Sequence, residues 1–210
     1  MFAAPFASLI TRFRRWLGAA EVFTVRGFQV VVENNRPDIE TPKVLARLDE
    51  ALALIEQYQP WRLAHLRRDL RQFWIVRYPC RGAYFPGAGT CMTELTFLAR
   101  TDIGAEVVAS SIVHEGVHAR VDRVRHLLGG GAALGPTPSP SRDMAREERL
   151  CRRAELAFGR ALPAGLGAPV IARAEASLAL DDADVAPVID WGDAHAAQVR
   201  VDNRSGGRQT

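Results

Sequence analysis

The feature that most restricts the fold is a helical repeat of apolar residues between about residues 103 and 128. The repeat consists of Val107, Val108, Ile112, Val117, Val121 and Val124. A long helix is therefore predicted here, and a run of three glycines that begins at Gly129 ends it. Residues four positions apart on a helix lie on one face. His114 and His118 should therefore lie one above the other, with Glu115 on the flank of that face.

The remaining pattern predicts a mixture of strands and helices. Strands are predicted where β-branched and aromatic residues are frequent, at residues 22–33, 73–78 and 90–98. Apolar residues at helical spacing predict further helices at residues 41–59, 61–72, 139–162 and 169–180. We therefore expect an α+β fold, with a small sheet packed beside a mainly helical body.

The length of 210 residues suits one domain with a sizeable core and terminal segments. We expect an amphipathic helix at residues 1–20, a single domain at 21–180, and an acidic segment with a disordered tail at 181–210. The formal charge of +3 is carried almost wholly by arginine, and no basic stripe with interleaved aromatic residues is present. A nucleic-acid partner is therefore not expected.

The first 18 residues combine apolar side chains at helical spacing with three arginines. The arginines follow the apolar stretch instead of preceding it, which argues against a signal peptide. We favour a helix packed on the domain, and the alternative is peripheral contact with a membrane surface. The chain has three cysteines and no CxxC pair, so we expect a reducing, cytoplasmic location.

The predicted long helix carries the pattern HExxH, which is a zinc-binding arrangement. Two imidazoles at this spacing can bind one tetrahedral zinc ion, and the glutamate between them can reach a water on that ion. Zinc lowers the pKa of such a water towards about 7, so a carboxylate can accept its proton. We therefore predict that His114 and His118 bind zinc and that Glu115 is the general base.

Residues 110–120, SSIVHEGVHAR, resemble the active-site helix of zincin metallopeptidases. Metzincins require a glycine and a histidine at the positions that Val121 and Val124 occupy here, so that group is excluded. Gluzincins take their third ligand from a glutamate on a following helix. The resemblance is to compact bacterial gluzincins, covers about residues 91–163, and implies a zinc-dependent peptidase.

The following helix offers several acidic residues as the third ligand. Glu148, Cys151 and Glu155 fall at i, i+3 and i+7 and share a face, whereas Glu147 lies off that face and is expected to face solvent. We predict Glu148 as the third ligand. Glu155 is the alternative, either as the ligand or as the partner that orients a histidine. Cys151 is a weaker candidate for a fourth ligand, because small buried cysteines are common.

Other residues are weaker candidates for this site. Tyr84 or His195 could stabilise an oxyanion, although a surface position is the favoured interpretation for each. Asp122 is expected behind the ligands or in solvent, and His126 is expected beyond reach of the metal. Residues 90–98 could pair with an extended substrate, or they could form an ordinary edge strand.

The leading hypothesis is a zinc-dependent metallopeptidase that hydrolyses bonds in a peptide or protein substrate. One alternative is a metal-binding protein without catalysis, in which the motif only joins two helices. The other is a membrane-surface adaptor that works through residues 1–18. Replacing Glu115 by glutamine separates the first two hypotheses, because a purely structural zinc site does not need this carboxylate.

Overall fold

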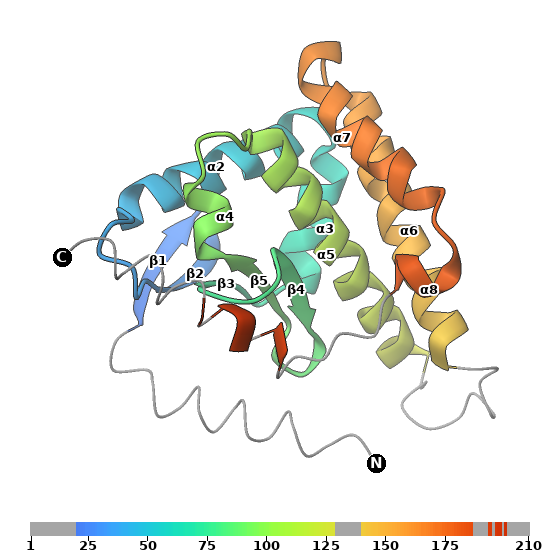
Figure 1. Ribbon diagram of the computed structural model, residues 1–210, viewed down its shortest axis with the longest axis horizontal. Coiled ribbons are helices and arrows are strands. Elements are labelled where there is room, and N and C mark those ends of the chain that lie inside the picture. The colour runs from blue at the N-terminus through green and yellow to red at the C-terminus, as the bar shows by residue number, and fades with distance from the viewer. Residues whose placement is uncertain (1–19, 129–139, 187–192, 195, 199, 201–210) are drawn as a thin grey trace.

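A mixed sheet lies beside a mostly helical body, and this arrangement confirms the α+β prediction (Figure 1). The computed structural model describes residues 20–128, 140–186, 193–194, 196–198 and 200. The expected amphipathic helix at the N-terminus, the loop from Gly129, and the tail from residue 201 lie outside the described residues. Within the described ranges, no helix combines the length and the apolar character that crossing a membrane requires.

The sheet has the strand order β1-β2-β3-β5-β4. Its strands are β1 (Glu21–Val25), β2 (Phe28–Glu33), β3 (Gln72–Val76), β4 (Gly82–Phe85) and β5 (Thr90–Glu94). The three central strands are parallel, and the edge strands β1 and β4 run antiparallel to their neighbours. Val30, Phe73 and Cys91 are in register across the central strands and are fully buried, so this face of the sheet forms core.

The single strand predicted at residues 22–33 is wrong, because this segment is a hairpin of two strands. Arg26 and Gly27 form the turn, with φ angles of 47° and 82°. A two-residue hairpin turn uses the left-handed backbone region, which glycine adopts without strain. One glycine between two apolar stretches was a weak indication of this turn, so the pattern predicted a continuous strand.

The helix that carries the HExxH motif lies between the sheet and the rest of the helical body. The helical segments are α2 (Thr41–Tyr58), α3 (Pro60–Asp69), α4 (Leu95–Ala99), α5 (Ala105–Leu127), α6 (Pro140–Ala161), α7 (Ala164–Leu178) and α8 (Asp182–Val185), with a 3-10 turn η1 (Pro86–Ala88). α5 contacts β4 and β5 on one side and α6 on another, and α7 packs along α6 (Figure 1). α7 begins five residues before the predicted start at residue 169 and includes Pro169.

The core between the sheet and helices α2, α3 and α5 fixes the position of α5. Its largest fully buried aliphatic side chains include Leu48, Leu52, Ile55, Leu63, Ile75 and Ile112. Each such side chain stabilises the fold by roughly 1.5–3 kcal/mol when it leaves water. Phe28 and Phe73 meet edge to face, with ring centroids 5.1 Å apart. Because Val108 and Ile112 anchor the inner face of α5, its neighbouring face can carry polar residues.

The strand predicted at residues 90–98 ends at Glu94, where α4 begins. The Oε2 atom of Glu94 accepts a hydrogen bond from the backbone N–H of Phe97 at 2.7 Å and so caps α4. Glutamate is not among the preferred N-cap residues, so the alternating pattern did not indicate this end. The turn-rich residues 79–89, where no strand was predicted, contain β4.

Candidate metal centre

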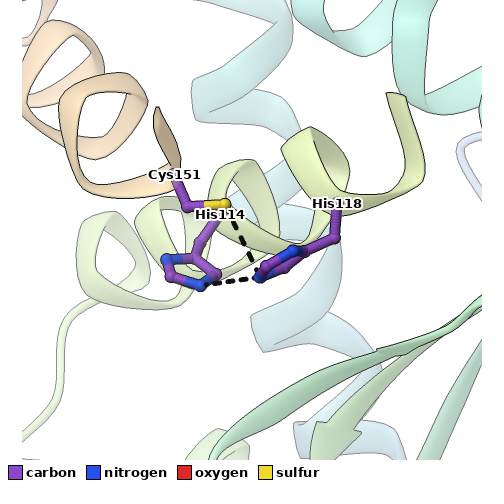
Figure 2. A group of neighbouring side chains, drawn as sticks. All are labelled: His114, His118 and Cys151. Atoms are coloured by element: carbon purple, nitrogen blue, oxygen red, sulfur yellow. Dashed lines mark hydrogen bonds between the residues drawn. The ribbon is translucent and has the colours of Figure 1, made fainter. Parts of the chain in front are cut away.

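The two histidines of the HExxH motif face α6 from consecutive turns of α5. Their Nε2 atoms lie 3.2 Å apart, so both rings point towards one place (Figure 2). His114 is buried and His118 is partly buried. The four-residue spacing of the motif accounts for this arrangement, because it places the side chains one above the other on the helix.

Glu148, on α6, is the glutamate that reaches this place. Its Oε2 atom lies 3.2 Å from Nε2 of His114, and its Oε1 atom lies 3.2 Å from Nε2 of His118. The structure therefore brings together the three residues that the sequence predicted as ligands. Glu155, the alternative, lies on the opposite side of the His114 ring and contacts Nδ1 instead.

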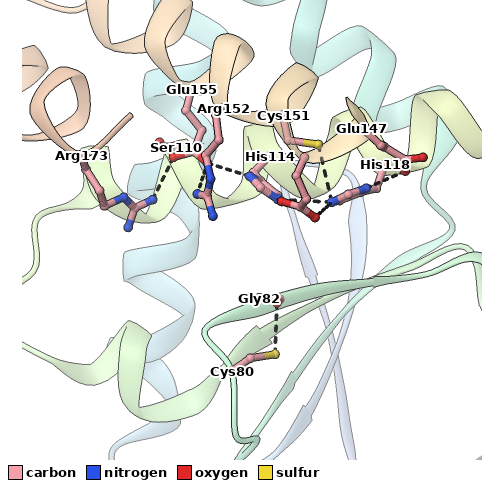
Figure 3. Close-up of polar contacts among 11 residues, drawn as sticks. Cys80, Gly82, Ser110, His114, His118, Glu147, Cys151, Arg152, Glu155 and Arg173 are labelled. Carbon is pink, nitrogen blue, oxygen red and sulfur yellow. Dashed lines mark hydrogen bonds and ion pairs between the residues drawn. The ribbon is translucent and has the colours of Figure 1, made fainter. Parts of the chain in front are cut away.

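The outer nitrogen of each histidine also contacts a carboxylate. His114 Nδ1 donates to Glu155 Oε1 at 2.7 Å, and His118 Nδ1 donates to Glu147 Oε1 at 2.8 Å (Figure 3). In the neutral form of each ring, such a bond places the proton on Nδ1 and the lone pair on Nε2, which is the atom that faces Glu148. The prediction that Glu147 faces solvent is wrong, because this side chain holds His118 and pairs with Arg125 at 2.7 Å.

Hydrogen bonds from three side chains hold the Glu155 carboxylate behind His114. Ser110 Oγ and Arg173 Nη2 each donate to Glu155 Oε2 at 3.0 Å, and Arg152 Nη1 donates to Oε1 at 2.6 Å (Figure 3). Glu155 is fully buried, and these bonds satisfy its two oxygens. The residues come from α5, α6 and α7, so the position of the His114 ring depends on three helices.

Cys151 brings a sulfur atom to the same cluster. Its Sγ atom lies 3.5 Å from Nε2 of His118, and the ligand atoms of His114, His118 and Cys151 all lie within 4.8 Å of one another (Figure 2). Cys151 follows Glu148 by three residues on α6, so both side chains project towards α5. The cluster thus contains two imidazole nitrogens, a carboxylate and a thiol, which are the donor types that zinc binds in proteins.

The electrostatics of the cluster favour a positive charge at its centre. Burial lowers the pKa of His118, but hydrogen bonds with Cys151, Glu147 and Glu148 outweigh this effect and raise it above its ordinary value. Burial raises the pKa of Glu148, but its bonds to the two histidines outweigh this effect and lower it. Without a metal ion, protons on the histidines balance the carboxylates, and a divalent cation can replace them.

Glu115 lies beside β4 at the edge of the sheet, and its carboxyl group interacts electrostatically with His114, His118 and Glu148. Burial is the main cause that raises the pKa of its carboxyl group above the ordinary value. A Cβ atom placed on Gly82 would lie 3.0 Å from Glu115 Oε1 and 3.0 Å from Ser111 Oγ. The first residue of β4 therefore leaves room for this carboxyl group only because it has no side chain.

The strand next to Glu115 is β4, and both interpretations of residues 90–98, as a substrate-pairing strand and as an ordinary edge strand, are wrong. β5 already pairs with β3 on one side and β4 on the other, so it has no free edge. β4 is the terminal strand, and in the part of the chain that the structure describes it pairs only with β5. Any extended peptide that adds to this end of the sheet would therefore add to β4.

Tyr84 on β4 is partly exposed. Its hydroxyl donates a hydrogen bond to Asp122 Oδ2 at 2.9 Å. Asp122 lies on α5, one turn beyond His118. Asp122 therefore connects α5 to β4 and does not contact the histidine cluster. His126 is exposed and bonds to the backbone oxygen of Asp122, away from the cluster, as expected. His195 lies outside the described residues.

No protein-family model, curated protein or solved structure matches this chain. The resemblance to zincins therefore depends on the HExxH helix and the glutamate helix alone. What the site can do must be argued from the geometry of its own residues, which offers several metal donors beside the buried carboxyl group of Glu115.

Proposed function

We propose that this chain is a zinc-dependent peptidase in which His114, His118 and Glu148 bind the ion. The proposal depends on three contacts of 3.2 Å, one between the two Nε2 atoms and one from each Nε2 atom to a Glu148 oxygen. A further carboxylate lies behind each ring. Three protein ligands of these types are typical of a catalytic zinc site. Bound zinc would supply Lewis-acid chemistry, polarising a carbonyl group and lowering the pKa of water towards about 7.

Glu147 and Glu155 position the ligands in this proposal. Each carboxylate accepts a hydrogen bond from Nδ1 of one histidine. Each ring therefore presents a basic nitrogen at Nε2 and cannot rotate freely. A carboxylate partner also makes the imidazole a stronger electron donor. These residues therefore support affinity for the ion without contacting a substrate.

Glu115 is the proton carrier in the proposed reaction. Its buried environment raises the pKa of its carboxyl group towards the working range of a general base. As a carboxylate it would take a proton from the attacking water, and as a carboxylic acid it would return the proton to the leaving amine. Its carboxyl group interacts electrostatically with His114 and His118, so it lies near the proposed ion.

The edge strand β4 supports a peptide as the substrate. An extended peptide can hydrogen-bond to the exposed edge of a strand, and alternate side chains then enter neighbouring pockets. Gly82 begins β4 directly beside Glu115, so a peptide paired with this strand would pass next to the proposed proton carrier. This placement is the reason for proposing peptide bonds and not another hydrolysable group.

The test compares zinc content and turnover in two variants of the full chain. Glu148→Ala should lose zinc, as measured by elemental analysis. Glu115→Gln should keep one zinc ion per chain and lose roughly 10²- to 10⁴-fold in hydrolysis of a quenched-fluorescent peptide library. Glu175→Gln, an exposed glutamate on α7, is the matched control and should change neither.

The position of Cys151 favours one alternative, a zinc site without catalysis. Four protein donors leave no position for water, and closed sites of this kind are structural. Equal peptide hydrolysis by the wild type and Glu115→Gln, with zinc bound in both, would support this alternative and overturn the peptidase proposal.

A further inference from the structure

We propose that Cys151 is a fourth protein donor to the zinc ion and that its thiolate keeps the peptidase latent. This inference rests on the proposed function, because it concerns the same ion. The thiolate would occupy the coordination position that an attacking water needs, and the enzyme would become active only when the sulfur leaves. The proposal therefore adds a regulated state to a site that three ligands would leave open.

The geometry places the sulfur among the other donors. Cys151 Sγ is 3.5 Å from His118 Nε2, the ligand atoms of His114, His118 and Cys151 lie within 4.8 Å of one another, and Cys151 is fully buried. In Figure 2 the sulfur lies over the gap between the two rings, on the α6 side. Glu148 reaches the same rings from one turn earlier on α6, so a single helix supplies both the oxygen and the sulfur donor.

The other two cysteines do not have this relationship to the histidines. Cys91 belongs to β5 and lies in register with Phe73 in the core. Cys80 donates a hydrogen bond from Sγ to the backbone oxygen of Gly82 at 3.2 Å, on the strand side of the site (Figure 3). Only Cys151 among the three cysteines therefore lies among the candidate metal ligands in the described chain.

The chemistry of the donors favours a bond between the sulfur and zinc. Thiolate is a soft ligand that zinc binds strongly, and imidazole and thiolate ligands occur together in zinc sites. A cysteine side chain has one rotatable bond, χ1, so its sulfur can move away without a change in the backbone. The same residue can therefore close the site firmly and still release it.

The closing and opening steps balance without an oxidant. On zinc loading, the S–H bond of Cys151 breaks, its proton passes to solvent, and a sulfur–zinc bond forms. On opening, the Cys151 thiolate would leave the ion and take a proton from solvent, and water would replace it as a ligand. A peptide substrate that pairs with β4 would favour the open state, because its carbonyl group competes with sulfur for the ion.

X-ray absorption at the zinc edge tests the sulfur bond directly on the zinc-loaded full chain. Wild type and the control Cys80→Ser should each show one sulfur neighbour at roughly 2.3 Å, and Cys151→Ser should show only nitrogen and oxygen neighbours. Cobalt substitution gives a second readout, because thiolate ligation adds a charge-transfer band in the near ultraviolet. The wild-type spectra need no variant, so the test survives poor folding of Cys151→Ser.

Two outcomes separate the failure of this inference from the failure of the proposed function. Stoichiometric zinc without a sulfur neighbour in the wild type would overturn the role of Cys151 and leave the peptidase proposal intact. Absence of bound zinc would overturn both.

Latency is tested on the same two variants with the peptide library. Zinc affinity of Cys151→Ser should fall at least about tenfold, which is the lower end of what the loss of an outer partner costs. At saturating zinc, Cys151→Ser should nevertheless hydrolyse the library faster than the wild type. Equal or slower hydrolysis, with sulfur ligation established in the wild type, would overturn the latency and leave Cys151 as a structural ligand.

Discussion

Glu155 Oε1 lies 2.7 Å from His114 Nδ1, on the edge of the ring opposite the nitrogen that faces Glu148. Burial raises the pKa of Glu155, but the bond from His114 and the charges of Arg152 and Arg173 lower it to about 2. The carboxyl group is therefore an anion buried behind a candidate metal ligand. Its bond with Arg173 connects that ligand to α7.

Replacing Glu155 by alanine should weaken zinc binding and destabilise the metal-free protein. Zinc affinity should fall by about 10- to 100-fold, because the His114 ring loses the partner that fixes its tautomer and orientation. The free energy of unfolding should fall by roughly 2–4 kcal/mol, since two arginines and a serine lose a buried acceptor. Competition with a chromogenic chelator measures the affinity, and urea unfolding measures the stability.

The matched control is Glu175→Ala on α7. Glu175 is exposed and pairs only weakly with the exposed Arg160 at 3.3 Å, so stability should change by less than about 0.5 kcal/mol. If Glu155→Ala keeps the zinc affinity of the wild type, His114 does not depend on this carboxylate.

Glu147→Gln should also weaken zinc binding, but by a smaller factor of about 10. The amide oxygen of glutamine can still accept a hydrogen bond from His118 Nδ1. It lacks the negative charge of Glu147, which strengthens the present bond of 2.8 Å. Arg125→Ala should have less effect, because Arg125 is half exposed and touches only Glu147 in this group. Isothermal titration with zinc measures both variants, and a larger loss in Arg125→Ala would contradict this order of importance.

Spacing along a helix was sufficient to predict which side chains meet at the candidate site. His114 and His118 share a face of α5, and Glu148 shares a face of α6 with Cys151. The role of Glu147 could not be predicted, because it depends on how closely α5 and α6 approach and at what angle. Adjacent residues on α6 therefore contact opposite edges of the His118 ring, with Glu147 at Nδ1 and Glu148 at Nε2.

The sheet was harder to predict than the helices. Alternation of apolar residues indicates a strand but does not distinguish an inner strand from an edge strand, so the pattern at residues 90–98 allows either position. The true edge, β4, is only four residues long and lies among glycines and prolines, which normally indicate a turn. Strand order depends on pairing between segments that are distant in the sequence, so a local sequence pattern cannot predict it.

Gly82→Ala should lower peptide hydrolysis about tenfold while zinc stays bound. The new methyl group would lie 3.0 Å from Glu115 Oε1 and Ser111 Oγ, so the proton carrier must move by a few tenths of an ångström. Gly87→Ala is the control, because a Cβ atom there has no neighbour within 4 Å. Turnover and zinc content are measured together, and equal turnover in both variants would mean that Glu115 has no role in the rate.

The stability of the metal-free protein should be greatest between about pH 4.5 and 6.5. The pKa values of His114 and His118 are raised above the ordinary 6.5, so their contribution is complete below that pH and is lost as pH rises. The pKa values of Glu148 and Glu155 are lowered below the ordinary 4.5, so their contribution is lost as pH falls. Urea unfolding in the presence of a chelator should therefore give the highest midpoint within this window.

Zinc binding at pH 7 should release at least about one proton from the histidines. The raised pKa of His118 means that this ring is protonated in the metal-free protein, and a metal ligand must be neutral. Zinc therefore displaces the proton, and the apparent affinity should rise with pH through neutrality. The Cys151→Ser variant removes the thiol, whose pKa burial raises to about 11 and whose proton would add to the count, while Glu147 and Glu148 still raise the pKa of His118.

Titration calorimetry in two buffers with different heats of ionisation gives the number of protons released. Glu147→Gln in the same background should release fewer protons at pH 7, because losing its charge lowers the pKa of His118. Release of no protons, with zinc bound, would mean that the histidines are already neutral at pH 7. The carboxylates around them would then stabilise the Nδ1 tautomer alone and not a charged ring.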